Sequence, residues 1–178
     1  PFSLDAALDR GYYEGLVQRA QPIEAAVGAP FRSLMANLID RINLVWLLRY
    51  RFNYGLPPAE VYYLLVASHY ALSGARLRDL AAQDSLEAVL AALPAAWQAR
   101  LAGVSDVPDV FARMERVAAE QALRVLRSRA PGIARAFAYL ILRERDLRAV
   151  RAVLRGRHLG LPDDDIRLAL RRAPVEFN

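Results

Sequence analysis

One segment of this chain occurs twice, and the duplication limits the fold more than any other feature. The first repeat (residues 40–57) runs from Asp40 through an apolar stretch to Arg49 and Arg51, then to Gly-Leu-Pro. The second repeat (residues 146–162) has the same order, from Asp146 to a second Arg-x-Arg and a second Gly-Leu-Pro. A helical unit used twice is typical of scaffolds whose faces bind partners. The duplication therefore favours a coupling or structural role over catalysis.

The hydrophobic pattern predicts an all-α protein built from duplicated helical lobes with pseudo-symmetric long helices. Apolar residues recur three and four positions apart, and no segment alternates as a strand would. We expect a largely buried helix ending near Asn53, a buried tyrosine-rich helix at 61–72, and long helices at 108–129 and 131–155. The stretch between Gly103 and Pro108 is the best candidate for a boundary. It gives two lobes, residues 1–103 and 104–178, with a single compact body as the simpler alternative.

The composition and motifs leave no basis for a catalytic, cofactor-binding or metal site. The chain has no cysteine and no HExxH or Gly-rich phosphate loop. We interpret His69 and His158 as packing or surface residues. The acidic run Asp163-Asp164-Asp165 could suggest a cation site, but a helix start explains it better, because acidic side chains favour the positive end of the helix dipole. No cofactor is expected.

The basic charge has two open explanations. The net charge is +5, and all 24 basic residues are arginine. One explanation is a coding bias toward arginine. The other is recognition of acidic groups, because the guanidinium fork binds carboxylates and phosphates through paired hydrogen bonds.

The second repeat supplies the candidate partner-facing residues. In the helix expected at 131–155, Ile133, Phe137 and Leu140 share one face, which we expect to face the core. Farther along, the same face becomes charged, so the helix should leave the core or meet a polar partner near Glu144. The predicted partner-facing residues on this face are Arg148, Arg151 and Arg155. The alternative is a solvated helix end with Glu144 and Arg148 paired.

A nucleic-acid-binding protein is the alternative function, because six arginines crowd residues 143–157. Such a cluster would give binding that weakens steeply with salt. Against it, the arginines point several ways around the helix, and no helix-turn-helix or aromatic stacking motif accompanies them.

Motifs along the chain resemble those of one family of rotary-ATPase subunits, the C subunit of the archaeal and bacterial vacuolar-type enzymes, which in eukaryotes is the d subunit. The first repeat resembles the family's acid-x-x-Asn-Leu helix, with Asp40, Asn43 and Leu44 at the matching positions. The second repeat resembles a second such helix, although Ala149 stands where the family usually has asparagine. The other segments that resemble the family are 4–13, with its Leu-Asp-x-x-Tyr-Tyr-like opening, and 84–97, with its short helices.

The resemblance implies a funnel-shaped, non-catalytic subunit of a V-type or A-type ATPase that takes part in proton or other ion transport. Such a subunit lies on the cytoplasmic face of the membrane proteolipid ring, receives the foot of the central stalk and acts as part of the rotor. It couples ATP hydrolysis or synthesis to ion transport and takes no small-molecule substrate. It is membrane-associated only through its partners. The family has three helical lobes, so we expect this chain to contain two, with the N-terminal lobe missing.

Overall fold

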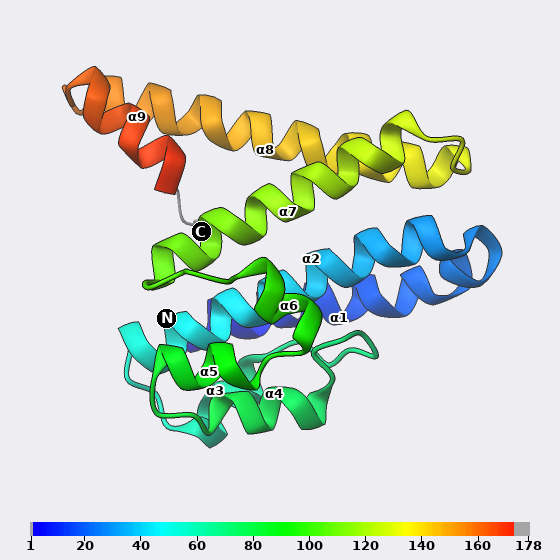
Figure 1. Cartoon of the computed structure of the whole chain (residues 1–178), viewed down its shortest axis with the longest axis horizontal. Helices are drawn as coiled ribbons and strands as arrows, with labels where there is room; N and C mark the ends of the chain where they lie inside the picture. Colours follow the sequence, from blue (N-terminus) through cyan, green and yellow to red (C-terminus); the bar gives the residue numbers. More distant parts are fainter. Residues whose placement is uncertain (1, 173–178) are drawn as a thin grey trace. The chain divides into compact units, whose positions relative to one another are not determined.

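The computed structural model describes residues 2–172, and within that range it contains helices and no strand. This confirms the prediction of an all-α fold. The chain divides into two compact units, residues 1–103 and 104–178 (Figure 1). Each unit has its own internal packing.

Unit 1 is built on a hairpin of two long helices, α1 (Phe2–Val27) and α2 (Ala29–Leu48). Gly28 joins them with a φ of 82°, a conformation that glycine adopts without strain. Helix α2 continues directly into a π-helical turn, η1 (Arg49–Asn53). The remaining helices of this unit are short: α3 (Pro58–Leu64), α4 (Gly74–Ala81), α5 (Leu86–Ala92) and α6 (Ala95–Arg100).

The core of unit 1 is centred on α2, which contacts α1, α3 and α4. Side chains on almost every side of α2 are buried, including Ile39, Ile42 and Leu47 at 0% exposure. A helix surrounded in this way must be apolar all round, because no face of it meets water. The part of the first repeat that lies in α2, residues 40–48, is therefore buried, as its sequence predicts.

The predicted helix at 61–72 is wrong beyond its first turn. Helix α3 ends at Leu64, and residues 65–73, which we call the inner loop, are not helical. Val66 and Leu72 in this loop are nevertheless fully buried. The backbone of the inner loop therefore needs hydrogen-bond partners from outside the loop.

Unit 2 consists of two long antiparallel helices and a shorter one: α7 (Val107–Arg127), α8 (Gly132–His158) and α9 (Asp163–Arg172) (Figure 1). Asp106 caps α7, its carboxylate accepting from the backbone N–H of Asp109 at 2.7 Å. Helix α9 contacts both α8 and α7. The acidic run begins α9, which confirms its interpretation as a helix start.

Helix α8 packs on its neighbours through small residues. Ala134, Ala138 and Gly156 are its buried positions, and a Cβ atom at Gly156 would lie 2.7 Å from Cγ1 of Ile166 in α9. Ile133 and Leu140 are instead exposed. The prediction that Ile133, Phe137 and Leu140 form the core-facing stripe is thus wrong for Ile133 and Leu140, whereas Phe137 is half-buried. Alanine and glycine let the helix axes approach closely, and the apolar partner surface is supplied by α7 and α9.

None of the helices in residues 2–172 is both long and apolar enough to cross a membrane.

Candidate functional site

The two repeats hold their polar residues in opposite environments, and the first repeat uses them to fix the inner loop. Asn43 is fully buried. Its Nδ2 donates to the backbone carbonyl of Val66 at 3.0 Å, and its Oδ1 accepts from the N–H of Val66 at 2.8 Å. One turn earlier on α2, Oδ1 of Asp40 accepts from the N–H of Leu72 at 3.0 Å. These two side chains supply the partners that the buried loop backbone requires.

Burial raises the pKa of Asp40 to about 6. Removal from water disfavours the carboxylate, and this effect exceeds the opposing stabilisation by hydrogen bonds from Leu72, Trp97 and Ala71. Asp40 is therefore a titratable group in the core of unit 1. Oδ1 of Asp40 accepts a hydrogen bond from the backbone of the inner loop, and this bond helps to hold the loop against α2.

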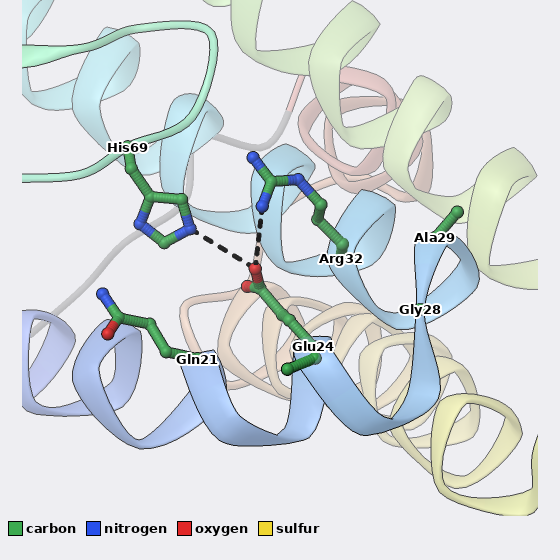
Figure 2. Close-up of a pocket in the computed structure, with 7 residues that line it drawn as sticks. Gln21, Glu24, Gly28, Ala29, Arg32 and His69 are labelled. Atoms are coloured by element: carbon green, nitrogen blue, oxygen red, sulfur yellow. Dashed lines mark hydrogen bonds and ion pairs between the residues drawn. The ribbon is translucent and has the colours of Figure 1, made fainter.

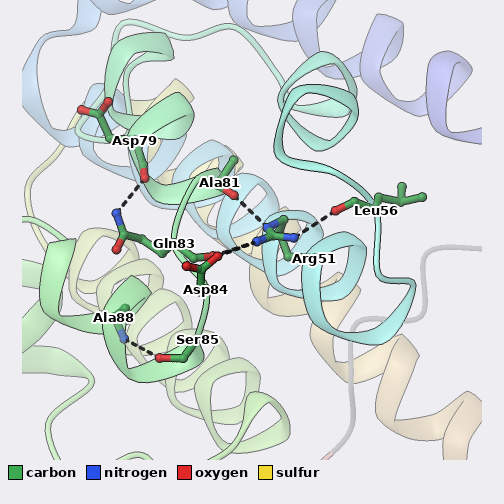
Figure 3. A network of polar contacts seen from close by, with 8 residues as sticks. All are labelled: Arg51, Leu56, Asp79, Ala81, Gln83, Asp84, Ser85 and Ala88. Carbon is green, nitrogen blue, oxygen red and sulfur yellow. Dashed lines mark hydrogen bonds and ion pairs between the residues drawn. The ribbon is translucent and has the colours of Figure 1, made fainter.

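Arg51 of the first repeat binds three backbone carbonyls at once. Its Nε donates to Ala81 at 2.8 Å, Nη1 to Leu56 at 3.1 Å and Nη2 to Gln83 at 3.0 Å (Figure 3). The side chain is only 14% exposed, and its ion pair with the fully exposed Asp84 is long at 3.7 Å. The guanidinium thus ties the end of η1 to the end of α4, a role that its five donors make possible.

A shallow pocket in unit 1 surrounds the buried carboxylate of Glu24 (Figure 2). Nη1 of Arg32 lies 3.4 Å from Oε2 of Glu24, and Nε2 of His69 lies 3.3 Å from the same oxygen. The hydroxyl of Tyr70 also donates to Glu24, and burial together with this bond raises the pKa of Tyr70. These contacts, including that of His69, hold the inner loop against α1. The part of the chain that the structure describes contains no group of three His, Cys, Asp or Glu side chains arranged to hold a metal.

The second repeat exposes the positions that the first repeat buries. Asp146 and Ala149, which correspond to Asp40 and Asn43, are both exposed on α8. Arg157, which corresponds to Arg51, is exposed as well. Within residues 2–172 these three positions of the second repeat bind no loop, and their side chains are exposed to solvent.

The three predicted partner-facing arginines differ in placement. Arg151 and Arg155 lie on the exposed part of α8. Arg148 instead donates from Nη2 to Oε1 of Glu115 in α7 at 3.0 Å, and the two side chains are 24% and 22% exposed. Arg148 therefore also has a role within unit 2. A pairing across two helices was missed because the sequence alone offered Glu144, one turn away, as its partner.

The two repeats end alike despite a one-residue difference in length. Gly55 and Gly160 both adopt positive φ, 66° and 69°, and both close a helix. Arg51 precedes its glycine by four positions and Arg157 by three. The π-helical turn η1 accommodates the extra residue, because its N–H groups bond five residues back, as Tyr54 does to Arg49 at 3.0 Å.

Comparison with protein families gives a match over residues 1–168 to the ATP synthase (C/AC39) subunit family. The chain belongs to this family. It is thus a subunit of the vacuolar and archaeal type of rotary ATPase, and the sequence-based identification of the family is confirmed. Nothing in this match supports the nucleic-acid alternative. Comparisons with curated proteins and with solved structures give no match.

Proposed function

We propose that this member of the C/AC39 family is a non-catalytic coupling subunit, which links the central stalk of the rotary ATPase to the membrane proteolipid ring. In this role it passes torque between ATP hydrolysis or synthesis and ion transport. The observation that carries the proposal is the family match over residues 1–168. The polar side chains of unit 1 support it, because Asn43, Arg51 and Glu24 are all engaged in holding backbone or neighbouring side chains.

The two compact units correspond, in this proposal, to two helical lobes of a funnel-shaped subunit. The subunit lies peripherally on the cytoplasmic face of the membrane and associates with it through its partner subunits. Arg151 and Arg155 of the second repeat face a partner, and Arg148 supports that surface through its bond to Glu115. Charge complementarity at such an interface raises the rate of association and fixes the alignment of the two partners, whereas affinity comes from buried contacts.

The test is affinity purification of the tagged full-length protein from detergent-solubilised membranes of the source cell, followed by mass spectrometry. We expect stalk and ring subunits to be recovered together, and an untagged strain to yield neither. Recovery of neither stalk nor ring subunits by a chain that circular dichroism shows to be helical would overturn the proposal.

The same purification tests the arginines. Arg151→Glu with Arg155→Glu should reduce recovery of partner subunits by roughly tenfold, because reversed charges repel the partner surface. Arg116→Glu, at an exposed position of α7, is the matched control and should leave recovery unchanged. Equal recovery by both variants would remove these arginines from the interface.

A further inference from the structure

The outer face of α1 is apolar and nearly free of charge. Leu4, Leu8 and Tyr12 follow one another on it at four-residue spacing, and their exposed fractions are 63%, 64% and 67%. Among the twelve exposed positions of residues 4–27, only Asp5 and Arg19 carry a charge. The solvated face of α7 is different, because every exposed position in the body of that helix is charged: Arg116, Glu120, Arg124 and Arg127. The outer face of α1 therefore has the composition of a contact surface.

Three of the six charged side chains of α1 have partners within unit 1. Nε of Arg10 donates to Oε1 of Glu14 at 2.8 Å, one turn along the helix. The carboxylate of Glu24 is buried in the pocket described above. At the end of the neighbouring helix, Arg49 of η1 donates from Nε to the hydroxyl of Tyr54 at 2.9 Å. These four charged groups are thus engaged within the unit.

The other three charged side chains, Asp5, Asp9 and Arg19, form no ion pair within residues 2–172. Asp5 and Asp9 are one turn apart, and burial together with the charge of Asp5 raises the pKa of Asp9. Two like charges at this spacing destabilise a helix slightly. A basic side chain from another molecule would relieve the repulsion between them.

The spacing of these charges makes the face complementary to a copy of itself. Asp5 and Arg19 each lie seven positions, or about two helical turns, from Tyr12, so the three residues fall on nearly the same line along α1. A parallel copy would place Asp5 against Asp5 and Arg19 against Arg19. An antiparallel copy centred on Tyr12 instead places Asp5 of each molecule opposite Arg19 of the other, with Asp9 one turn away. Each unpaired charge then lies near an opposite one.

We propose that the outer face of α1 is a self-association surface, on which a second copy of this chain docks in the antiparallel direction. Leu8 and Tyr12 form the centre of the contact, and Asp5 with Arg19 of the other copy forms an ion pair at each end. A contact between single helices is at the small end of specific interfaces, so association should be weak and depend on concentration. The inference does not rest on the proposed function.

Sedimentation equilibrium of the full chain tests self-association directly. Between roughly 1 and 100 µM we expect a reversible equilibrium of monomer and dimer. The double variant Leu8→Glu with Tyr12→Glu should raise the dissociation constant at least tenfold, because it places charges at the centre of the contact. Tyr63→Glu, at a tyrosine of α3 that is 70% exposed, is the matched control and should associate as the native chain does.

An exchange of charges separates docking from a change in folding. Asp5→Arg alone and Arg19→Asp alone should each weaken the dimer by roughly fivefold or more, because each substitution affects two ion pairs of the symmetric contact. Both substitutions in one chain restore opposite charges at both ends, so the dissociation constant should return to within about twofold of the native value. A disturbed fold would not be repaired by the second substitution.

Cysteine cross-linking tests the antiparallel direction, because the native chain has no cysteine. Gly11→Cys lies beside the centre of the contact, and a Cβ atom there would meet nothing within 4 Å in its own chain. Its two copies should come within the Cα distance of about 7 Å that a disulfide needs, and mild oxidation should join them. Leu4→Cys is the control, because antiparallel pairing separates its two copies by about 24 Å along the helix.

Four results would overturn the inference. They are a monomeric chain across the concentration range, association that Leu8→Glu with Tyr12→Glu leaves unchanged, charge exchange that restores nothing, and cross-linking of Leu4→Cys as fast as that of Gly11→Cys. Recovery of stalk or ring subunits from membranes by a chain that stays monomeric would leave the proposed function standing and remove only the self-association.

Discussion

The two repeats have the same order of residues, yet one is the centre of a core and the other is a surface. In the first repeat, Asp40, Asn43 and Arg51 make hydrogen bonds to backbone groups of other segments of unit 1. In the second, Asp146, Ala149 and Arg157 occupy the corresponding positions and are exposed. Both copies of the duplicated segment are thus helices that end at a glycine. The polar side chains bind backbone inside the unit in the first copy, whereas they are exposed in the second.

The strongest test of this difference exchanges the residues at one matched position. Asn43→Ala gives the first repeat the residue that the second repeat has, and it leaves the buried N–H and C=O of Val66 without their partner. We expect the free energy of unfolding to fall by about 3–5 kcal/mol, since each unsatisfied group costs roughly 1–3 kcal/mol. Urea unfolding followed by circular dichroism measures it.

The reciprocal change, Ala149→Asn, is the control. It lies on the exposed side of α8, so it should alter stability by no more than about 0.5 kcal/mol. A loss below about 1 kcal/mol for Asn43→Ala would contradict the fastening role.

The arginine pair gives the second test. Arg51→Ala removes three hydrogen bonds from a nearly buried guanidinium and should lower the free energy of unfolding by about 2–3 kcal/mol, because water can reach the released carbonyls only in part. Arg51→Lys should recover some of this loss, since one ammonium group cannot reach all three carbonyls. Arg157→Ala, its counterpart in the second repeat, should change stability by no more than about 0.5 kcal/mol. Equal losses at the two positions, measured by urea unfolding, would contradict the comparison.

The pH dependence of stability gives the third test. The pKa of Asp40 is about 6 in the folded chain against 3.8 for the ordinary group. The folded state therefore holds its proton more tightly than the unfolded state. Stability from this residue is fully present below about pH 4 and is lost as the pH rises through 6.

Comparison with Asp40→Asn isolates this contribution, because the amide does not titrate. The stability of the variant relative to the native chain should rise by about 2 kcal/mol between pH 4 and pH 7, a pKa unit being worth ~1.4 kcal/mol. Unfolding curves at several pH values measure the difference. A constant difference across this range would show that the carboxyl group does not titrate there.

The smallest effect belongs to the ion pair within unit 2. A double-mutant cycle with Arg148→Ala and Glu115→Ala should give a coupling of about 0.5–1 kcal/mol, as both side chains are partly solvated. The same cycle with Arg151→Ala in place of Arg148→Ala should give no coupling. A coupling for Arg151 as large as that for Arg148 would place both arginines on the inner side of α8.

Sequence patterns predicted the fold class, the buried first repeat and the long helices of unit 2, because these depend on local periodicity and on glycine and proline. The inner loop could not be predicted in this way. Residues 61–72 are apolar enough for a helix, but Asn43 and Asp40 capture their backbone from 23 and 32 positions away. The prediction that Ile133 and Leu140 of α8 face the core was wrong for another reason. These large side chains were expected inside, whereas Ala134 and Ala138 make the contact and carry almost no hydrophobic signal.

The candidate surface was predicted in part. Arg151 and Arg155 are on the exposed part of α8, as the charged stripe indicated. The hydrogen bond from Arg148 to Glu115 depends on how α7 and α8 are aligned, and the sequence pattern of one helix does not predict this alignment.

The π-helical turn at the end of the first repeat has a consequence for how such a duplication can change in length. Inserting one residue into a regular α-helix turns every later side chain by about 100° and would move Gly55-Leu56-Pro57 to another side of the helix. In η1 the extra residue is taken up within five residues, so the glycine still closes the helix as Gly160 does. Insertions and deletions in this protein should therefore be tolerated just before the glycine, because the repeat can change length there while the chain still leaves the helix on the same side.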